Sequence, residues 1–74
     1  MGSIQYDKPG GMPQAEQDFD DLTGGASITL PGGIRTGTLP DGSTISVRPQ
    51  SSQGDPTIQI NPADGSNPIK IRYN

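Results

Sequence analysis

The chain has 74 residues and a net charge of −3, and only 27% of its residues are hydrophobic and 4% aromatic. A chain of this length forms one small domain, and so few apolar side chains leave it little material for a core. It contains no Cys and no His, which excludes disulfides, cysteine-based zinc sites and every catalytic triad that includes His.

The first eleven residues show no hydrophobic periodicity and end in Pro9-Gly10-Gly11. Because such clusters interrupt regular structure, we predict that residues 1–11 are a flexible lead-in to a single domain over residues 12–74. Within the lead-in, residues 1–3 resemble a vector-derived start, and we assign them no structural role.

A helix is predicted from about residue 13 to residue 22. Pro13 suits the first helical position, and the stretch up to Leu22 contains no glycine and no β-branched residue. Apolar residues recur at helical spacing and form one stripe, which consists of Met12, Ala15, Phe19 and Leu22. Gly24-Gly25 ends the helix.

The rest of the chain consists of short runs that alternate apolar and polar residues, as half-buried strands do. We predict weak strands over 26–30 and 34–39, with a bulge at Gly37, and clearer strands over 43–48, 57–60 and 69–73. Pro40-Asp41-Gly42 predicts a tight hairpin between the second and third of these.

The predicted fold class is therefore α+β, with one short N-terminal helix packed on a small four- to five-stranded antiparallel sheet. The helix would cover the apolar face of this sheet. Eleven glycines and eight prolines make disorder of the isolated chain the competing prediction.

Three cations fall on the polar side of the last three strands, namely Arg48, Lys70 and Arg72. If these strands pair, the guanidinium and ammonium groups converge on one face that suits a phosphate group. The negative total charge permits this, because residues 1–34 hold one cation against five carboxylates while residues 35–74 hold four cations against three. The alternative is that these cations only keep a half-exposed sheet soluble.

The loop after Arg48 is a second candidate site, because it is long and rich in short polar side chains. Ser51, Ser52 and Thr57 would add hydroxyl groups beside Arg48. The alternative is an ordinary solvated loop. The acidic segment from Glu16 to Asp21 lacks EF-hand spacing and is predicted to be a solvated helix face, so we predict no metal and no cofactor.

Several motifs together resemble a known group of proteins: a Leu39-Pro40-Asp41-Gly42 turn, an Arg48-Pro49-Gln50-Ser51-Ser52 loop, a Pro56-Thr57-Ile58-Gln59-Ile60 strand and a Lys70-Ile71-Arg72-Tyr73 end. The pattern covers roughly residues 16–73. It resembles the C-terminal toxin domains of bacterial polymorphic toxins and contact-dependent growth inhibition proteins. Many of these belong to the barnase–EndoU–colicin–RelE group of ribonucleases.

The resemblance implies metal-independent cleavage of RNA, with tRNA as the expected substrate, and a cognate immunity protein as partner. The RNA 2′-hydroxyl would attack the adjacent phosphorus and leave a 2′,3′-cyclic phosphate. Without His, proton transfer would use Lys70, a hydroxyl group or water. The expected catalytic residues are Arg48, Lys70, Arg72, Ser51 and Thr57, and the expected substrate-binding residues are Arg35, Ser52, Thr44 and Gln59.

Such a domain would be secreted or displayed at the cell surface as part of a larger toxin and would act in the cytoplasm of the target cell. We predict neither a membrane partner nor a DNA partner. Two other functions stay open: a non-catalytic β-rich module of a secreted surface protein or phage appendage, and an acidic nuclease inhibitor that binds through the Glu16–Asp21 segment.

Overall fold

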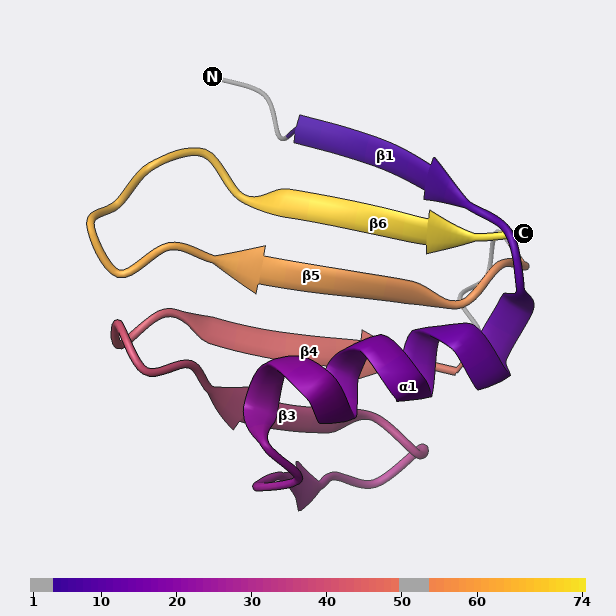
Figure 1. Cartoon of the computed structure of the whole chain (residues 1–74), viewed down its shortest axis with the longest axis horizontal. Coiled ribbons are helices and arrows are strands. Elements are labelled where there is room, and N and C mark those ends of the chain that lie inside the picture. Colours follow the sequence, from indigo (N-terminus) through magenta and orange to yellow (C-terminus); the bar gives the residue numbers. More distant parts are fainter. Residues whose placement is uncertain (1–3, 50–53) are drawn as a thin grey trace.

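The computed structural model describes residues 4–49 and 54–74 of the chain (Figure 1). Within these ranges it has one helix, α1 (Gly11–Thr23), and one six-stranded sheet. The strands are β1 (Ile4–Lys8), β2 (Ile28–Thr29), β3 (Arg35–Thr38), β4 (Thr44–Arg48), β5 (Thr57–Asn61) and β6 (Ile69–Tyr73). The prediction of an α+β fold with a single helix on a small sheet is confirmed.

The strand order across the sheet is β1-β6-β5-β4-β3-β2. Strands β2 to β6 form the predicted antiparallel meander, whereas β1 pairs in parallel with β6. The predictions of a purely antiparallel sheet and of at most five strands are therefore wrong. The extra strand arises because the two ends of the described chain pair, which local periodicity does not reveal.

Strand β1 lies within the segment that was predicted to be a flexible lead-in, so this prediction is wrong for Ile4–Lys8. Residues 1–3, to which no structural role was assigned, lie outside the described residues. The Pro9-Gly10-Gly11 cluster does interrupt regular structure, as expected, but it does so between a strand and a helix.

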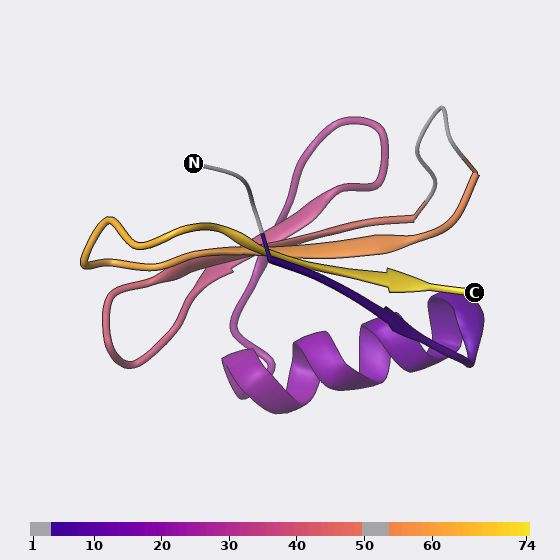
Figure 2. The same ribbon diagram turned by 90° about the horizontal axis from the view of Figure 1, so that it is seen from above.

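The molecule has two layers, with α1 lying along one face of the sheet and the opposite face open (Figure 2). The helix packs against β4, β5 and β6. The core that results is small and consists of Ala15, Phe19, Ile45, Val47, Ile58 and Tyr73. The predicted helical stripe therefore faces the sheet through Ala15 and Phe19, while Leu22 at its end stays 44% exposed.

Helix α1 begins two residues before its predicted start and ends one residue after its predicted end, with Gly24 as a left-handed cap at φ 66°. Its entry is tight, because Gly10 has φ 111° and a Cβ there would lie 2.6 Å from the Cβ of Gln14. Only glycine fits this position without a shift, which lets the chain turn directly from β1 into the helix.

The hairpin predicted at Pro40-Asp41-Gly42 is confirmed, since Gly42 N donates to Leu39 O at 2.9 Å and Thr38 pairs with Thr44. Gly37 does not form the predicted bulge, because it pairs in register with Ile45. A Cβ at Gly37 would lie 2.9 Å from the carbonyl oxygen of Ala26. The glycine is thus needed where the chain leaving α1 crosses β3, and the weak strand predicted over 26–30 shortens to Ile28–Thr29.

Candidate anion-binding face

The cross-strand register assigns each strand residue to one of the two faces of the sheet. Val47, Ile58 and Ile71 are neighbours in register and point toward the helix layer. Because side chains alternate along a strand, the residues on either side of them point away from α1. We call this side the outer face; its residues on β4, β5, β6 and β1 are Thr44, Ser46, Arg48, Thr57, Gln59, Asn61, Lys70, Arg72, Gln5 and Asp7.

Three cations lie close together on the outer face. Arg48 pairs with Thr57, and Thr57 pairs with Arg72, so the two arginines occupy one row with a threonine between them. Neighbouring strands lie about 4.8 Å apart, which separates the two arginine Cα atoms by about 10 Å. Lys70 lies two residues from Arg72 on β6, about 7 Å along the strand. Long side chains at these spacings can close on one phosphate group or on two neighbouring ones.

The outer-face cations differ from the other two cations in their surroundings. Lys8 Nζ lies 2.6 Å from Asp18 Oδ2, and Arg35 Nη2 lies 2.8 Å from Asp20 Oδ1, both on the helix side. Across residues 4–49 and 54–74, every ion pair involves Lys8 or Arg35. None of these ion pairs involves an outer-face cation, and Asp7, beside Arg72 in register, is the one carboxylate on the outer face of these strands.

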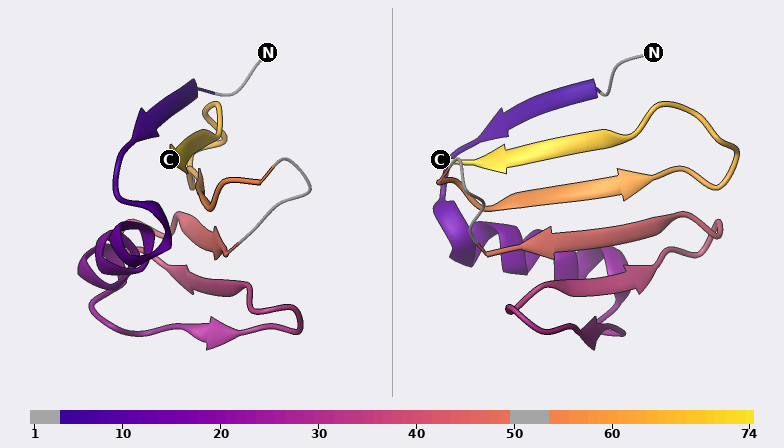
Figure 3. Two further views of the ribbon diagram at one scale, coloured as in Figure 1. Left: turned by 90° about the vertical axis from the view of Figure 1, so that its right-hand side faces the viewer. Right: turned by 180° about the vertical axis from the view of Figure 1, so that it is seen from behind.

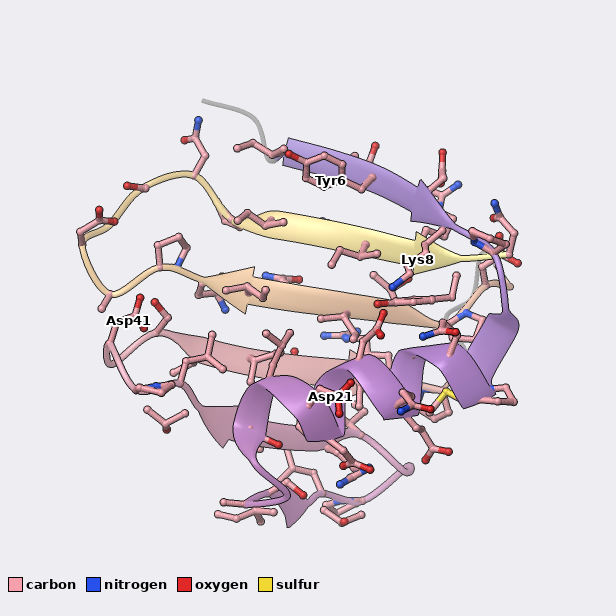
Figure 4. The ribbon with its side chains drawn as sticks, viewed as in Figure 1. Tyr6, Lys8, Asp21 and Asp41 are labelled. Atoms are coloured by element: carbon pink, nitrogen blue, oxygen red, sulfur yellow. The ribbon has the colours of Figure 1, made fainter. Side chains whose placement is uncertain are left out.

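Half of the acidic side chains lie on the helix, on the opposite side of the sheet. Helix α1 contains four carboxylates and no cation, and Figure 4 shows Asp21 on this helix, away from the sheet. Four of the eight carboxylates thus lie on the helix layer, and three of the five cations lie on the outer face. A local positive potential can exist there despite the negative total.

Two further predicted site residues lie beside the outer-face cations. Thr57 stands between the arginines, but its hydroxyl donates to Asp55 O at 3.2 Å, so this proton is already engaged. Gln59 pairs with Lys70 in register, and its amide donates to Asn61 Oδ1 at 3.1 Å. Thr44 shares the face but lies at the far end of β4 from Arg48. Ser51 and Ser52 lie outside the described residues.

Arg35, which was expected to bind substrate, does not lie with this group. It pairs in register with Val47, which puts it on the helix side of the sheet. Its guanidinium carbon lies 4.8 Å from the centre of the Phe19 ring, and Nη2 also donates to Ser27 Oγ at 3.1 Å. This residue therefore stabilises the contact between helix and sheet.

A second polar cluster, which no sequence pattern predicted, lies on the helix side. The buried Tyr73 donates its hydroxyl to Asp18 Oδ2 at 2.7 Å, and Asp18 also accepts bonds from Lys8 at 2.6 Å and from Gln14 at 2.9 Å. Figure 4 shows Lys8 extending from β1 toward α1. Because β1, β6 and α1 meet only in the tertiary structure, no local pattern in the sequence signals this cluster.

The cluster shifts two titrations. The hydrogen bond from Lys8, and next that from Tyr73, lower the pKa of Asp18 below its usual range, although burial opposes them. Burial, followed by the hydrogen bond to Asp18, raises the pKa of Tyr73 far above its usual range. Both shifts favour the forms that bond to each other, which is typical of a stabilising contact. Since Tyr73 points away from the outer face, the cluster is separate from the candidate site.

Among the described residues, no three His, Cys, Asp or Glu side chains gather in a way that could hold a metal ion. In the same part of the chain, no helix has the length and hydropathy needed to cross a bilayer. No family model, curated protein or solved structure matches the chain.

Proposed function

We propose that this chain binds the phosphate backbone of RNA on its outer face. The observation that carries the proposal is the register that aligns Arg48, Thr57 and Arg72 in one row and places Lys70 beside them. Charged hydrogen bonds from Arg and Lys are among the strongest contacts a protein makes to phosphate. The exposed face of a sheet can offer such contacts to a long backbone without a deep pocket.

The outer face favours contacts to the backbone over contacts to bases. Phe19 and Tyr73 lie in the core, and Tyr6 points to the helix side, so the described strands offer no aromatic side chain for stacking on this face. Binding would then be electrostatic and independent of sequence. Ser46 and Gln59 lie next to the cations and suit the 2′-hydroxyl, the group that distinguishes RNA from DNA.

Cleavage of the bound RNA, which the toxin resemblance implies, is the stronger form of the proposal. Arg48 and Arg72 would stabilise the charge that develops on the phosphate oxygens as the 2′-hydroxyl attacks. The proton acceptor would be Asp7 or the neutral amine of Lys70, which lie on the same face, or a water molecule from solvent. In this form the partner is an immunity protein with an acidic surface that covers the cations, and delivery is from a larger secreted or surface-displayed toxin.

The proposal is tested by the salt dependence of RNA binding. Fluorescence anisotropy with a labelled single-stranded RNA would be measured over a range of salt concentrations. For three phosphate contacts, log K should fall with log salt at a slope of about −2, at about 0.7 per contact. Arg48→Gln, Lys70→Gln and Arg72→Gln should each flatten the slope by about 0.7.

Lys8→Gln is the matched control, because it removes the same charge from the opposite side of the sheet. Its slope should equal that of the unmodified chain once circular dichroism has shown that it is folded. Equal losses for Lys8→Gln and the outer-face variants would show that only the total charge matters and would reject the site.

The same samples, incubated with total cellular RNA, separate the two forms of the proposal. Discrete RNA fragments that vanish in the Lys70→Gln variant support an enzyme. Intact RNA together with salt-dependent binding supports a non-catalytic binding module. Protection of cells on expression, without RNA binding, would instead support the nuclease inhibitor.

A further inference from the structure

Strand β1 forms an open edge of the sheet. The two edge strands are β1, with five residues, and β2, with two. All residues of β1 are exposed, and Figure 3 shows the strand at the rim of the molecule beyond β6. Natural sheets usually protect such an edge with a proline, a bulge or a covering segment. Within the described residues β1 has no proline, bulge or covering segment on its outer side, and its two charged residues, Asp7 and Lys8, have opposite signs.

The hydrogen bonds to β6 show which backbone groups of β1 are open. Ile4 N donates to Pro68 O at 2.8 Å, and Lys8 O accepts from Asn74 N at 2.9 Å. Backbone groups alternate in direction along a strand, so Ile4, Tyr6 and Lys8 bond toward β6. The N–H and C=O groups of Gln5 and Asp7 therefore point to the open edge.

We propose that two copies of this chain associate by antiparallel pairing of their β1 strands, with Tyr6 on the two-fold axis. In an antiparallel ladder, residues whose groups point outward face each other and exchange two hydrogen bonds. If Gln5 of each copy faces Asp7 of the other, two such residue pairs form. The outward N–H and C=O groups of Gln5 and Asp7 in both strands are then all hydrogen-bonded. The inference does not depend on RNA binding.

The alternative registers are poorer. Pairing Asp7 with Asp7 of the second copy puts two carboxylates directly opposite each other, which is destabilising. Pairing Gln5 with Gln5 of the second copy leaves Asp7 without a partner among the described residues. In the proposed register Gln5 faces Asp7 and Ile4 faces Lys8, so no like charges are opposed. This self-complementarity is why the occupant of the edge is a second copy.

Exposed apolar side chains on β1 support the same register. Tyr6 is 57% exposed and Ile4 is 44% exposed. They pair in register with Ile71 and Ile69 on the helix side of the sheet. Helix α1 lies over the β3 and β4 side of this face, away from the labelled Tyr6 (Figure 4). At the two-fold axis the two Tyr6 residues form a non-hydrogen-bonded pair, whose side chains approach most closely. Pairing would cover the two Tyr6 rings. It would also place both helices on one side of the joined sheet and both outer faces on the other side.

Charge changes at residue 5 test the register. Gln5→Asp opposes a carboxylate to Asp7 of the second copy at two symmetric places and should weaken dimerisation about 2- to 30-fold. Gln5→Lys should tighten it by a similar factor. Within one chain Gln5 pairs with Lys70, so Gln5→Asp adds attraction inside the fold while it removes attraction between copies. Thermal unfolding of dilute samples then separates loss of dimer from loss of fold.

The measurement is sedimentation velocity from micromolar to millimolar chain, combined with amide hydrogen exchange. The amides of Gln5 and Asp7 should become protected as the concentration rises, whereas that of Tyr6 should be protected at every concentration. A chain that stays monomeric at millimolar concentration would overturn the proposal. A dimer whose affinity does not change with the charge at residue 5 would also overturn it, and so would a dimer in which the Gln5 and Asp7 amides stay unprotected. Either result would show that the copies associate through another surface.

Discussion

The bond between Tyr73 and Asp18 offers the sharpest test of how this small domain is held together. Tyr73 is fully buried, and its hydroxyl donates to Asp18 at 2.7 Å. Replacing Asp18 by alanine leaves that hydroxyl without a partner inside the protein and also breaks the contact with Lys8. We expect this variant to lose much of its stability.

The size of the loss follows from the geometry. A buried hydrogen bond to a charged group contributes about 1.5–3 kcal/mol, whereas the Lys8 contact adds only about 0.5 kcal/mol because the Lys8 side chain is 46% exposed. Asp18→Ala should therefore cost about 2–4 kcal/mol and Tyr73→Phe about 1–2 kcal/mol. A domain of 74 residues has a free energy of unfolding of about 4–11 kcal/mol.

The assay is urea denaturation followed by far-ultraviolet circular dichroism, applied to both single variants and to the double variant. The double variant should lose about 1–2 kcal/mol less free energy of unfolding than the two single variants lose together, because it no longer contains a buried tyrosine hydroxyl without a partner. Asp21→Ala is the matched control, since Asp21 is exposed on the same helix and should change stability by less than about 0.5 kcal/mol. Strict additivity, or equal effects of Asp18→Ala and Asp21→Ala, would refute the reasoning.

Three other predictions concern the same fold. Hydrogen bonds, foremost that from Lys8, lower the pKa of Asp18. The contribution of Asp18 to stability is therefore present above about pH 4 and is lost as the pH falls through the lowered pKa. Urea midpoints measured against pH should fall less steeply in acid for Asp18→Asn than for the unmodified chain. Gly37→Ala should cost about 1–3 kcal/mol in thermal denaturation, because its Cβ would lie 2.9 Å from the Ala26 carbonyl oxygen. Gly10→Ala should cost about as much, since φ is 111° there, and a loss below about 0.5 kcal/mol at either glycine would contradict the steric argument.

The placement of the outer-face cations shows how far local patterns reach. The alternation that separates Ile45 and Val47 from Arg48 is a property of an extended backbone, in which successive side chains point to opposite faces. Once β4, β5 and β6 pair in the register that buries their apolar residues, the faces of Lys70 and Arg72 follow. Likewise, the tight turn at Pro40-Asp41-Gly42 depends on the backbone preferences of these residues themselves.

Arg35, Gly37 and β1 show where local patterns stop. The face on which Arg35 lies depends on how β3 pairs with β4, and the weak alternation around Gly37 does not specify that pairing. Glycine is needed at residue 37 because the backbone at Ala26, eleven residues earlier in the chain, passes close to it. Residues Ile4 to Asp7 alternate apolar and polar side chains, which is the local signal of β1, but nothing near them in the sequence indicates that this strand pairs with β6.

The sequence by itself determined the class of the fold, the helix, most of the meander and the face that carries Arg48, Lys70 and Arg72. These features depend on side-chain periodicity and turn preferences, which act over a few neighbouring residues. Only the tertiary structure decided that β1 pairs with β6, that Arg35 packs on Phe19 and that Asp18 binds Tyr73. Each of these joins residues far apart in the chain, so it forms only where the packing of the whole domain compensates the entropy of closing a long loop.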